Sequence, residues 1–179
     1  HDALPICIAG GIFKKGDEVT LLPSGFTTKV AKIDSFDGEV EEAFPPMSVT
    51  ILLEEDYDLS RGDMIVRPHN QPDITQDIEV MLCWFDQSRP LQERGKYLIR
   101  HTSQEARCMV KEVRYKLDIN TLHRNLEDRT LRMNDMGRVV LRITKPLFVD
   151  AYRKNRITGS IILVDEGTNS TVAAGMVIG

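Results

Sequence analysis

The chain has 179 residues, of which 41% are hydrophobic and 28% are charged, a composition typical of a globular protein rather than a disordered one. Its length suits one large or two small domains, since domains usually contain about 100–150 residues. No apolar run approaches the roughly 20 residues that span a bilayer, and no basic segment leads into an apolar one as in a signal peptide. We therefore expect a cytoplasmic protein without a membrane partner.

The formal net charge of −4 is unevenly distributed along the chain. Residues 1–70 hold 6 basic and 13 acidic side chains, a balance of −7, whereas residues 71–179 hold 17 and 14, a balance of +3. The change falls at RPHNQPD, residues 67–73, where two prolines and an asparagine are typical of a boundary. The sequence predicts two domains, 1–69 and 72–179, and neither is basic enough by itself to indicate nucleic-acid binding.

Short strands separated by turns are predicted in the first domain at 18–22, 26–33 and 47–54, and 58–66 is predicted to be a polar turn that leads into a short apolar strand. Pro23 and Gly25 favour a turn after the first of these strands, because proline presets φ and glycine allows positive φ. Asp37–Gly38 is a second turn signal. In 47–54 the apolar residues alternate, so one face of that strand is expected to be buried.

The second domain is predicted to contain strands at 77–85, 95–102 and 137–144 and a closing hairpin at 157–179. In 137–144, Val139, Leu141 and Ile143 are expected to face inward, Arg138 and Arg142 outward, with the strand ending at Pro146. The closing segment has two apolar runs around a polar turn, which predicts a hairpin buried in a barrel. Gly159 and Gly175 are expected where backbones pack closely.

Two segments of the second domain are ambiguous. The apolar residues of 106–117 alternate, but the alternation changes phase within the segment. Val113, Tyr115 and Leu117 therefore point to the opposite strand face from the apolar residues that precede them in this segment. A strand with a bulge near Lys111–Glu112 explains the change and is favoured over a helix. Residues 119–133 are interpreted as a long loop with at most one helical turn, although Ile119, Leu122, Leu126 and Met133 lie close to one helical face. Strands at intervals of about 8–12 residues predict an all-β barrel or sandwich.

Residues that carry catalytic or metal-binding chemistry are few and scattered. No GxxxxGK[ST] phosphate loop is present, and Gly10–Gly11 is interpreted as a tight strand crossing. Cys7, Cys83 and Cys108 lack metal-site spacing and are expected to be reduced buried thiols. The histidines are far apart in sequence, and each is expected to be a surface or loop-anchoring imidazole; they are His1, His69, His101 and His123. We predict no catalytic, cofactor-binding or metal-binding residue in this chain, and no bound cofactor.

Charged clusters are the remaining candidates for function. The acidic run around Asp37–Glu42 and the run Glu54–Asp58 do not follow the oxygen spacing of a metal-binding loop, so solvated turns or a docking face are expected. Two basic sets could meet an acidic partner or RNA phosphates, or form an ordinary solvated strand face. They are Arg153, Lys154 and Arg156, and Arg100, Arg107, Arg114 and Lys116. RGD at 61–63 and NST at 169–171 are expected to be turns.

Several long segments resemble one family. The hairpin ITGSIILVDEGTNSTVAAGMVIG at 157–179 is similar to the closing hairpin of elongation-factor-Tu-like GTPases, and GDEVTLLPSG, VTILLE and SRGDMIV resemble their second domain. A narrower resemblance is to the large, GTPase subunit of bacterial assimilatory sulfate adenylyltransferase (ATP sulfurylase). It rests on three segments, IDSFDGEVEEAFPPMSVTILLEEDYDLSRGD at 33–63, EVRYKLDINTLHR at 112–124 and LRMNDMGRVVLRITKPLFVDAYRKNRITGSIILVDEGTNSTVAAGM at 131–176.

The resemblance implies two consecutive antiparallel β-barrels of the translation-factor type. It implies GTP and Mg²⁺ in an upstream GTPase domain of the parent protein, with hydrolysis coupled to synthesis of adenosine 5′-phosphosulfate from ATP and sulfate. Adenylyl transfer would belong to a separate, smaller catalytic subunit. These barrels would then dock that subunit and their own GTPase domain and would be inactive alone. The alternatives are a two-barrel region of a translation-type GTPase that binds RNA and, after it, a free-standing β-barrel that binds a small ligand.

Overall fold

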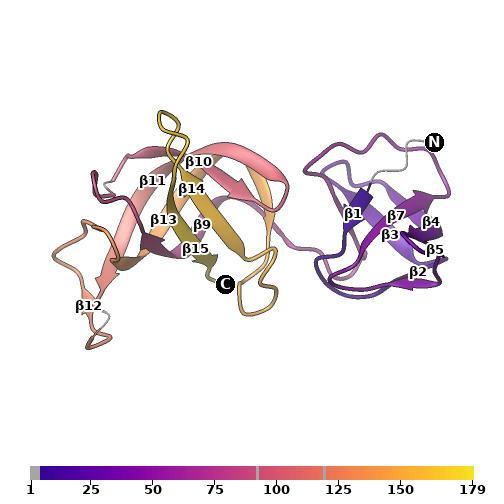
Figure 1. Ribbon diagram of the computed structural model, residues 1–179, viewed down its shortest axis with the longest axis horizontal. Coiled ribbons are helices and arrows are strands. Elements are labelled where there is room, and N and C mark those ends of the chain that lie inside the picture. The colour runs from indigo at the N-terminus through magenta and orange to yellow at the C-terminus, as the bar shows by residue number, and fades with distance from the viewer. Residues whose placement is uncertain (1–4, 92, 119) are drawn as a thin grey trace. The chain divides into compact units, whose positions relative to one another are not determined.

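A computed structural model describes residues 5–91, 93–118 and 120–179 of the chain (Figure 1). Within these ranges it contains fifteen strands and no helix, so the all-β prediction is confirmed. No helix of the described residues is therefore long and apolar enough to cross a membrane. The chain divides into two compact units, His1–Gln71 and Pro72–Gly179.

The first unit contains eight of the strands. They are β1 (Pro5–Cys7), β2 (Phe13–Lys14), β3 (Glu18–Leu22), β4 (Thr27–Ser35), β5 (Gly38–Glu39), β6 (Glu42–Ala43), β7 (Ser48–Leu53) and β8 (Met64–Val66). The sheet order is β1-β7-β4-β3-β8, with β5 on β4 and a separate β2–β6 ribbon. Phe13 of β2 and Ala43 of β6 join Val19, Val30 and Ile33 in one buried cluster. Ribbon and sheet therefore enclose a single core.

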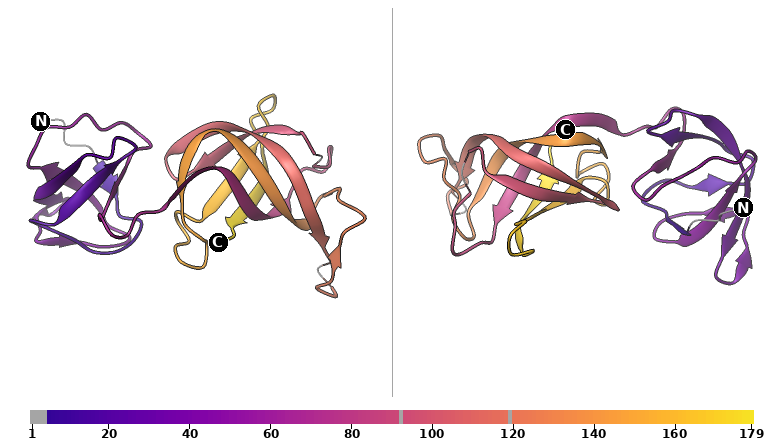
Figure 2. Two further views of the ribbon diagram at one scale, coloured as in Figure 1. Left: turned by 180° about the vertical axis from the view of Figure 1, so that it is seen from behind. Right: turned by 90° about the horizontal axis from the view of Figure 1, so that it is seen from above.

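The second unit is a closed six-stranded antiparallel barrel with one short extra strand. Its strands are β9 (Asp73–Trp84), β10 (Lys96–His101), β11 (Gln104–Leu117), β12 (Arg124–Asn125), β13 (Met136–Val149), β14 (Ser160–Val164) and β15 (Thr171–Val177). Neighbours follow the order β10-β14-β15-β9-β13-β11, and the pairing of β10 with β11 closes the ring (Figure 2). The loop that carries β12 projects away from the barrel (Figures 1 and 2).

Alternation of apolar residues explains the core of this barrel. Ile78, Val80 and Leu82 point inward from β9, and Val139, Leu141 and Ile143 point inward from β13, each at most 2% exposed. The predicted closing hairpin is confirmed, because β14 and β15 pair around a turn and their inward residues belong to the same cluster. The predicted bulge is confirmed too, since Val110 pairs with Leu141 and Glu112 with Val140, which leaves Lys111 as the extra residue.

Three local expectations were wrong. Strand β13 does not end at Pro146 but continues to Val149. The pairing of β13 with β9 is interrupted between Arg142 and Leu147, so the proline, which has no N–H, is not required to donate a hydrogen bond to the neighbouring strand. A second register shift around Arg114 pairs Tyr115 with Arg138 on the outer face, where Tyr115 is buried at 8% exposure but lies outside the main buried cluster of the barrel. Gly10 and Gly11 form an exposed bend rather than a tight crossing.

Residues 119–133 contain no helix where the structure describes them; the loop is interrupted by the two-residue strand β12 and by an isolated β-bridge between Leu131 and Leu91. Ile119 and His1, which the sequence singled out, lie outside the described residues. The RGD segment contains a turn that leads into β8, as predicted. Of NST, Asn169 and Ser170 lie in the connection between β14 and β15, just after its turn at 166–168, and Thr171 begins β15.

Candidate functional site: the charged face of the second barrel

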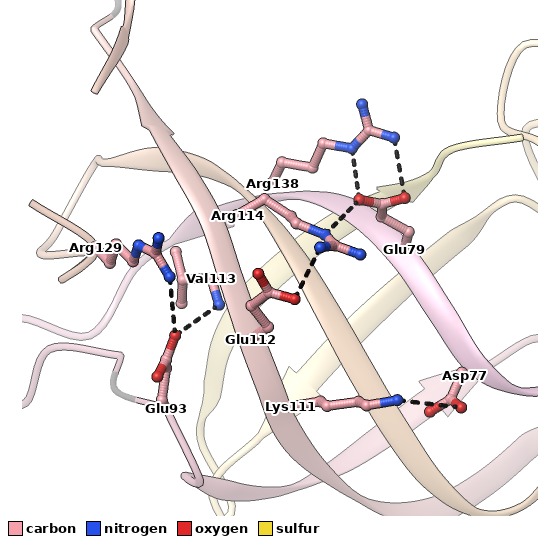
Figure 3. A network of polar contacts seen from close by, with 9 residues as sticks. All are labelled: Asp77, Glu79, Glu93, Lys111, Glu112, Val113, Arg114, Arg129 and Arg138. Atoms are coloured by element: carbon pink, nitrogen blue, oxygen red, sulfur yellow. Dashed lines mark hydrogen bonds and ion pairs between the residues drawn. The ribbon is translucent and has the colours of Figure 1, made fainter. Parts of the chain in front are cut away.

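Opposite charges from three neighbouring strands meet on the outside of the second barrel. We call this set the charged face, and its members are Asp77, Glu79, Lys111, Glu112, Arg114, Arg138 and Arg142. Figure 3 shows all of them except Arg142. Strand β9 contributes only acids and β13 only arginines, at positions that alternate with the core residues. Strand β11 places Lys111 and Arg114 there because each is the extra residue at a register shift.

Glu79 is the centre of the network. Arg138 donates two parallel hydrogen bonds to it, from Nε to Oε1 at 2.7 Å and from Nη2 to Oε2 at 2.9 Å. Arg114 of β11 reaches across β13 to the same carboxylate at 3.4 Å and also pairs with Glu112 at 2.9 Å. The Arg138 hydrogen bonds are the largest cause that holds the pKa of Glu79 below its usual value, and Glu79 in turn raises the pKa of Arg138. Bidentate geometry of this kind fixes orientation as well as charge.

Asp77 forms the second node. Its Oδ2 accepts a hydrogen bond from Arg142 and lies 3.6 Å from the Nζ atom of Lys111. Its Oδ1 is buried and has no hydrogen-bond partner among the described residues. Val140 lies between Glu79 and Glu112 in the register and is only 9% exposed although it points outward. The long charged side chains around it account for this burial.

Five of the seven basic residues singled out in the second unit are paired with carboxylates. Arg100 pairs with Glu105, Arg107 with Glu166, and Lys116 with Asp135 at 2.6 Å. Arg114 belongs to the charged face described above. Because each of these four cations has a carboxylate within ion-pair distance, they form a neutralised strand face rather than an open basic stripe. In the cluster before the last hairpin, Lys154 pairs with Asp150 at 2.9 Å.

The acidic runs of the first unit are partly paired and otherwise exposed. Lys14 contacts Glu42 at 3.3 Å, and Lys15 contacts Glu39 at 3.4 Å. The side chains at 54–56 and at 58 are exposed. Within the described ranges, no group of three histidine, cysteine or acidic side chains could hold a metal ion.

The buried titratable side chains are held in the fold in ways that do not suit catalysis. His101 is 2% exposed, its Nε2–H donates to the Thr158 carbonyl at 2.7 Å, and burial is the main cause that lowers its pKa. It anchors the segment before β14, which agrees with the loop-anchoring interpretation. Burial raises the pKa of Cys108 to about 12, so this thiol is a poor nucleophile. The expectation of three buried thiols was wrong for Cys7, which is exposed at β1, and for Cys83, which is half-buried.

Sequence reasoning did not identify the charged face as a site. It placed Arg138 and Arg142 on the outer side of their strand, but the acids that hold them come from a strand 59 and 65 residues away. One pattern in the sequence could have identified this face. Asp77 and Glu79 point outward on one strand, and arginines point outward on another, but their pairing is visible only when the order of the strands in the sheet is known. The face offers fixed, mutually neutralised charges, and chemically it suits contact with another protein surface better than proton transfer.

The fold and this site place the chain in a known class. A family profile described as GTP-eEF1A C-terminal domain-like matches residues 77–178, more than half of the chain, and the chain belongs to this family. A structure of sup35 complexed with GDP superposes with a TM-score of 0.86 at 18% identity, covering 98% of this chain and 43% of that one. The Ski7 GTPase-like domain of S. cerevisiae, bound to GTP, gives 0.73 at 14% identity. At these identities the likeness shows the fold alone, the two-barrel fold of translation-factor type.

More similar sequences narrow the class further. The bifunctional enzyme CysN/CysC of Mycobacterium tuberculosis is 47% identical over 178 residues, which are 99% of this chain and 29% of that enzyme. Sulfate adenylyltransferase subunit 1 of Bacteroides fragilis is 43% identical over 171 residues, 96% of this chain and 36% of that subunit. The predicted family resemblance is therefore confirmed. The chain spans about a third of the length of these curated relatives.

Proposed function

We propose that this chain is the two-barrel region of a sulfate adenylyltransferase subunit 1, and that it docks the smaller catalytic subunit and relays the GTP state of its own GTPase domain. The observation that carries the proposal is the 47% and 43% identity that extends over nearly the whole chain, both barrels included. The parent protein would act in sulfate assimilation, in the cytoplasm, and these barrels would supply no reacting group.

Two features of the described residues support a scaffold rather than a catalyst. The buried histidine and the buried thiol are held in forms that do not favour proton transfer or nucleophilic attack, since burial lowers the pKa of His101 and raises that of Cys108. The charged face, with its bidentate hydrogen bonds, lies on the outside of the barrel, where it can contact another protein. Charges at the edge of a protein–protein interface mainly determine the association rate and the specificity of binding.

The alternative, an RNA-binding pair of barrels, requires a continuous positive surface for phosphates. Of the seven cations that suggested it, five are paired with carboxylates; they are Arg100, Arg107, Arg114, Lys116 and Lys154. We therefore favour a protein partner, and the experiment below treats RNA binding as a competing outcome.

The deciding experiment measures binding of the purified chain to the smaller sulfate adenylyltransferase subunit and, separately, to tRNA, by isothermal titration calorimetry. We expect a stoichiometric complex with the subunit and no saturable binding of tRNA at 150 mM salt. The chain alone is expected to show neither GTP hydrolysis nor sulfate adenylylation. Binding of tRNA without the subunit would overturn the docking proposal, and turnover by the chain alone would overturn the assignment as scaffold.

The relay is tested separately in the full-length parent protein. Charge-reversed Arg138→Glu on the charged face should reduce the GTP dependence of sulfate adenylylation if this face transmits or receives the nucleotide state. Arg153→Glu, an exposed position before the last hairpin, is the matched control. Unchanged GTP dependence in the Arg138 variant, with intact folding, would exclude the charged face from the relay.

A further inference from the structure

Two aromatic rings of the first unit stack on each other at its surface. Phe26 lies between β3 and β4 and is 56% exposed, and Tyr57 lies in the segment between β7 and β8. Their ring centroids are 5.2 Å apart, with an angle of 18° between the ring planes. The Phe26 carbonyl accepts a hydrogen bond from the Leu21 amide at 2.8 Å, which fixes the backbone that carries this ring. The pair therefore presents an ordered aromatic surface to solvent.

A hollow of about 190 Å³ lies beside this aromatic pair. It is formed by β3, β4 and the segment that follows β7, and Thr27 of its lining is the chain neighbour of Phe26. Glu55 joins the two features, because it lines the hollow and its Oε2 accepts a hydrogen bond from the Tyr57 hydroxyl at 3.1 Å. The volume is below the range of about 300–1,000 Å³ of small-molecule sites, so the hollow suits the head group of one side chain.

Carboxylates outnumber cations around this hollow. Glu18, Glu54 and Glu55 line it, and the cation among the described residues of its lining is Lys29. Lys29 lies opposite Glu18 in the β3–β4 pairing and can offset at most one of the three negative charges. None of the three acids forms an ion pair with another residue in the described part of the chain. The hollow therefore keeps an excess of negative charge.

Further oxygen atoms near the aromatic pair lack a donor. Thr28 lines the hollow and is only 6% exposed, and its hydroxyl has no hydrogen-bond partner within the described ranges. Asp56 and Asp58 flank Tyr57 in the chain, are exposed, and form no ion pair with any residue that the structure describes. A ligand that complements this surface must bring positive charge and several hydrogen-bond donors.

We propose that the hollow and the aromatic pair dock an arginine-bearing segment of a partner protein. A guanidinium group carries several N–H donors in one plane, so one group can bond to carboxylates on more than one side of the hollow. Guanidinium also stacks on aromatic faces, and the exposed ring of Phe26 offers such a face next to the hollow. The carbon stem of the arginine can lie along the same ring while its charged head reaches the acids.

Other occupants fit this surface less well. Within the described ranges no three acidic, histidine or cysteine side chains are placed to hold a metal ion, so an inorganic cation lacks a ligand set. The phosphates of a nucleic acid would be repelled by the excess of negative charge. The surface lies on the first unit and the charged face on the second, so this inference goes beyond the docking and relay proposed above and does not depend on them.

Fluorescence anisotropy of a fluorescein-labelled peptide of alternating arginine and leucine residues, titrated with the full chain, tests the proposal. At about 150 mM sodium chloride, attraction between charges more than roughly 8 Å apart is largely screened. We expect saturable binding of one peptide per chain. The double variant Glu54→Gln/Glu55→Gln should bind about tenfold more weakly or worse, because charge-assisted hydrogen bonds are lost. Phe26→Leu, which keeps an apolar side chain but removes the ring, should bind about threefold more weakly.

The matched control is the double variant Asp37→Asn/Glu41→Gln, which removes the same charge from exposed positions of the same unit outside the hollow. Its affinity should equal that of the wild type, and an equal loss there would overturn the proposal in favour of diffuse attraction. Absence of saturable peptide binding would also overturn it, as would wild-type affinity in either hollow variant. In a further arm, saturable binding of spermidine without binding of the peptide would assign the hollow to a free polyamine instead.

Discussion

Gly159 occupies a position where neighbouring backbone leaves no room for a side chain. A Cβ atom there would lie 2.4 Å from Tyr152 Cα and 2.6 Å from the Asn155 carbonyl oxygen. These atoms belong to the turn before β14, which is fixed by the Gly159 amide donating to Asn155 at 2.9 Å. At Gly175 the nearest atoms, at 3.1 Å, belong to the side chains of Ile161 and Leu82, which can move.

We therefore predict that Gly159→Ala destabilises the second barrel by at least about 3 kcal/mol and Gly175→Ala by about 1 kcal/mol, while the valine variant of each unfolds it. Gly167→Ala, in an exposed turn, is the control and should be near neutral. Urea denaturation followed by Trp84 fluorescence gives the free energies of unfolding. Equal stability of Gly159→Ala and the wild type would contradict the buried-hairpin interpretation.

His101 should make stability depend on pH. Its pKa is lowered in the fold, mainly by burial, so the unfolded chain binds the proton more readily. The free energy of unfolding therefore keeps its full value above the unfolded pKa of about 6.5 and decreases as pH falls below that pKa. His101→Gln, whose amide can still donate to Thr158, should flatten the decrease in unfolding free energy between pH 7 and 5. The exposed His69→Gln should retain that decrease, and a decrease unchanged in the His101 variant would contradict the argument.

The three thiols should differ in reactivity. Cys7 is exposed, Cys83 half-buried, and Cys108 both buried and raised in pKa to about 12. Because the thiolate is the reactive form, a disulfide reagent should modify Cys7 first and Cys108 only after unfolding. Mass spectrometry of the native protein after a short exposure checks the order, and Cys7→Ser should remove the fast product. Early modification of Cys108 would show that the barrel opens locally.

Among the elements, the strands with clear alternation could be predicted from sequence and the irregular ones could not. β3 agrees with the prediction of 18–22, and the bulge at Lys111 was visible because it changes the parity of apolar residues. The shift around Arg114 was hidden, because Tyr115 kept an apolar character while moving to the outer face. The charged face depends on which strands are neighbours, and the spacing along one strand carries no information on that.

The network across β9, β13 and β11 should add stability in a pH-dependent way. The pKa of Glu79 is lowered chiefly by the hydrogen bonds from Arg138, so its contribution is present above the unfolded value of about 4.5 and is lost as pH falls through the lower folded value. Glu79→Gln should reduce the unfolding free energy at pH 7 by about 1 kcal/mol. The difference from the wild type should disappear at strongly acidic pH.

Glu127→Gln, an exposed acid of the loop that carries β12, is the matched control for this measurement. It should leave the unfolding free energy unchanged at both pH values. A Glu79→Gln deficit that persists undiminished at acidic pH would mean that the residue acts through packing rather than charge.

The whole molecule consists of two compact units, each with its own buried cluster, and the division falls between Gln71 and Pro72. The second unit has a closed ring of strand pairs and a core drawn from all six of its barrel strands. A closed barrel has no unpaired edge and needs no neighbour to complete its hydrogen bonding. The second unit therefore contains what an independent domain requires.

We predict that residues 72–179 expressed alone fold cooperatively and bury Trp84 as in the full chain. Trp84 is 1% exposed, so a folded fragment should show a blue-shifted emission that moves to the red in one urea transition. The midpoint should lie within experimental error of the second-barrel transition in the full chain. A fragment that emits like free tryptophan without urea would mean that the first unit is needed for the second to fold, and the two barrels would then form one cooperative unit.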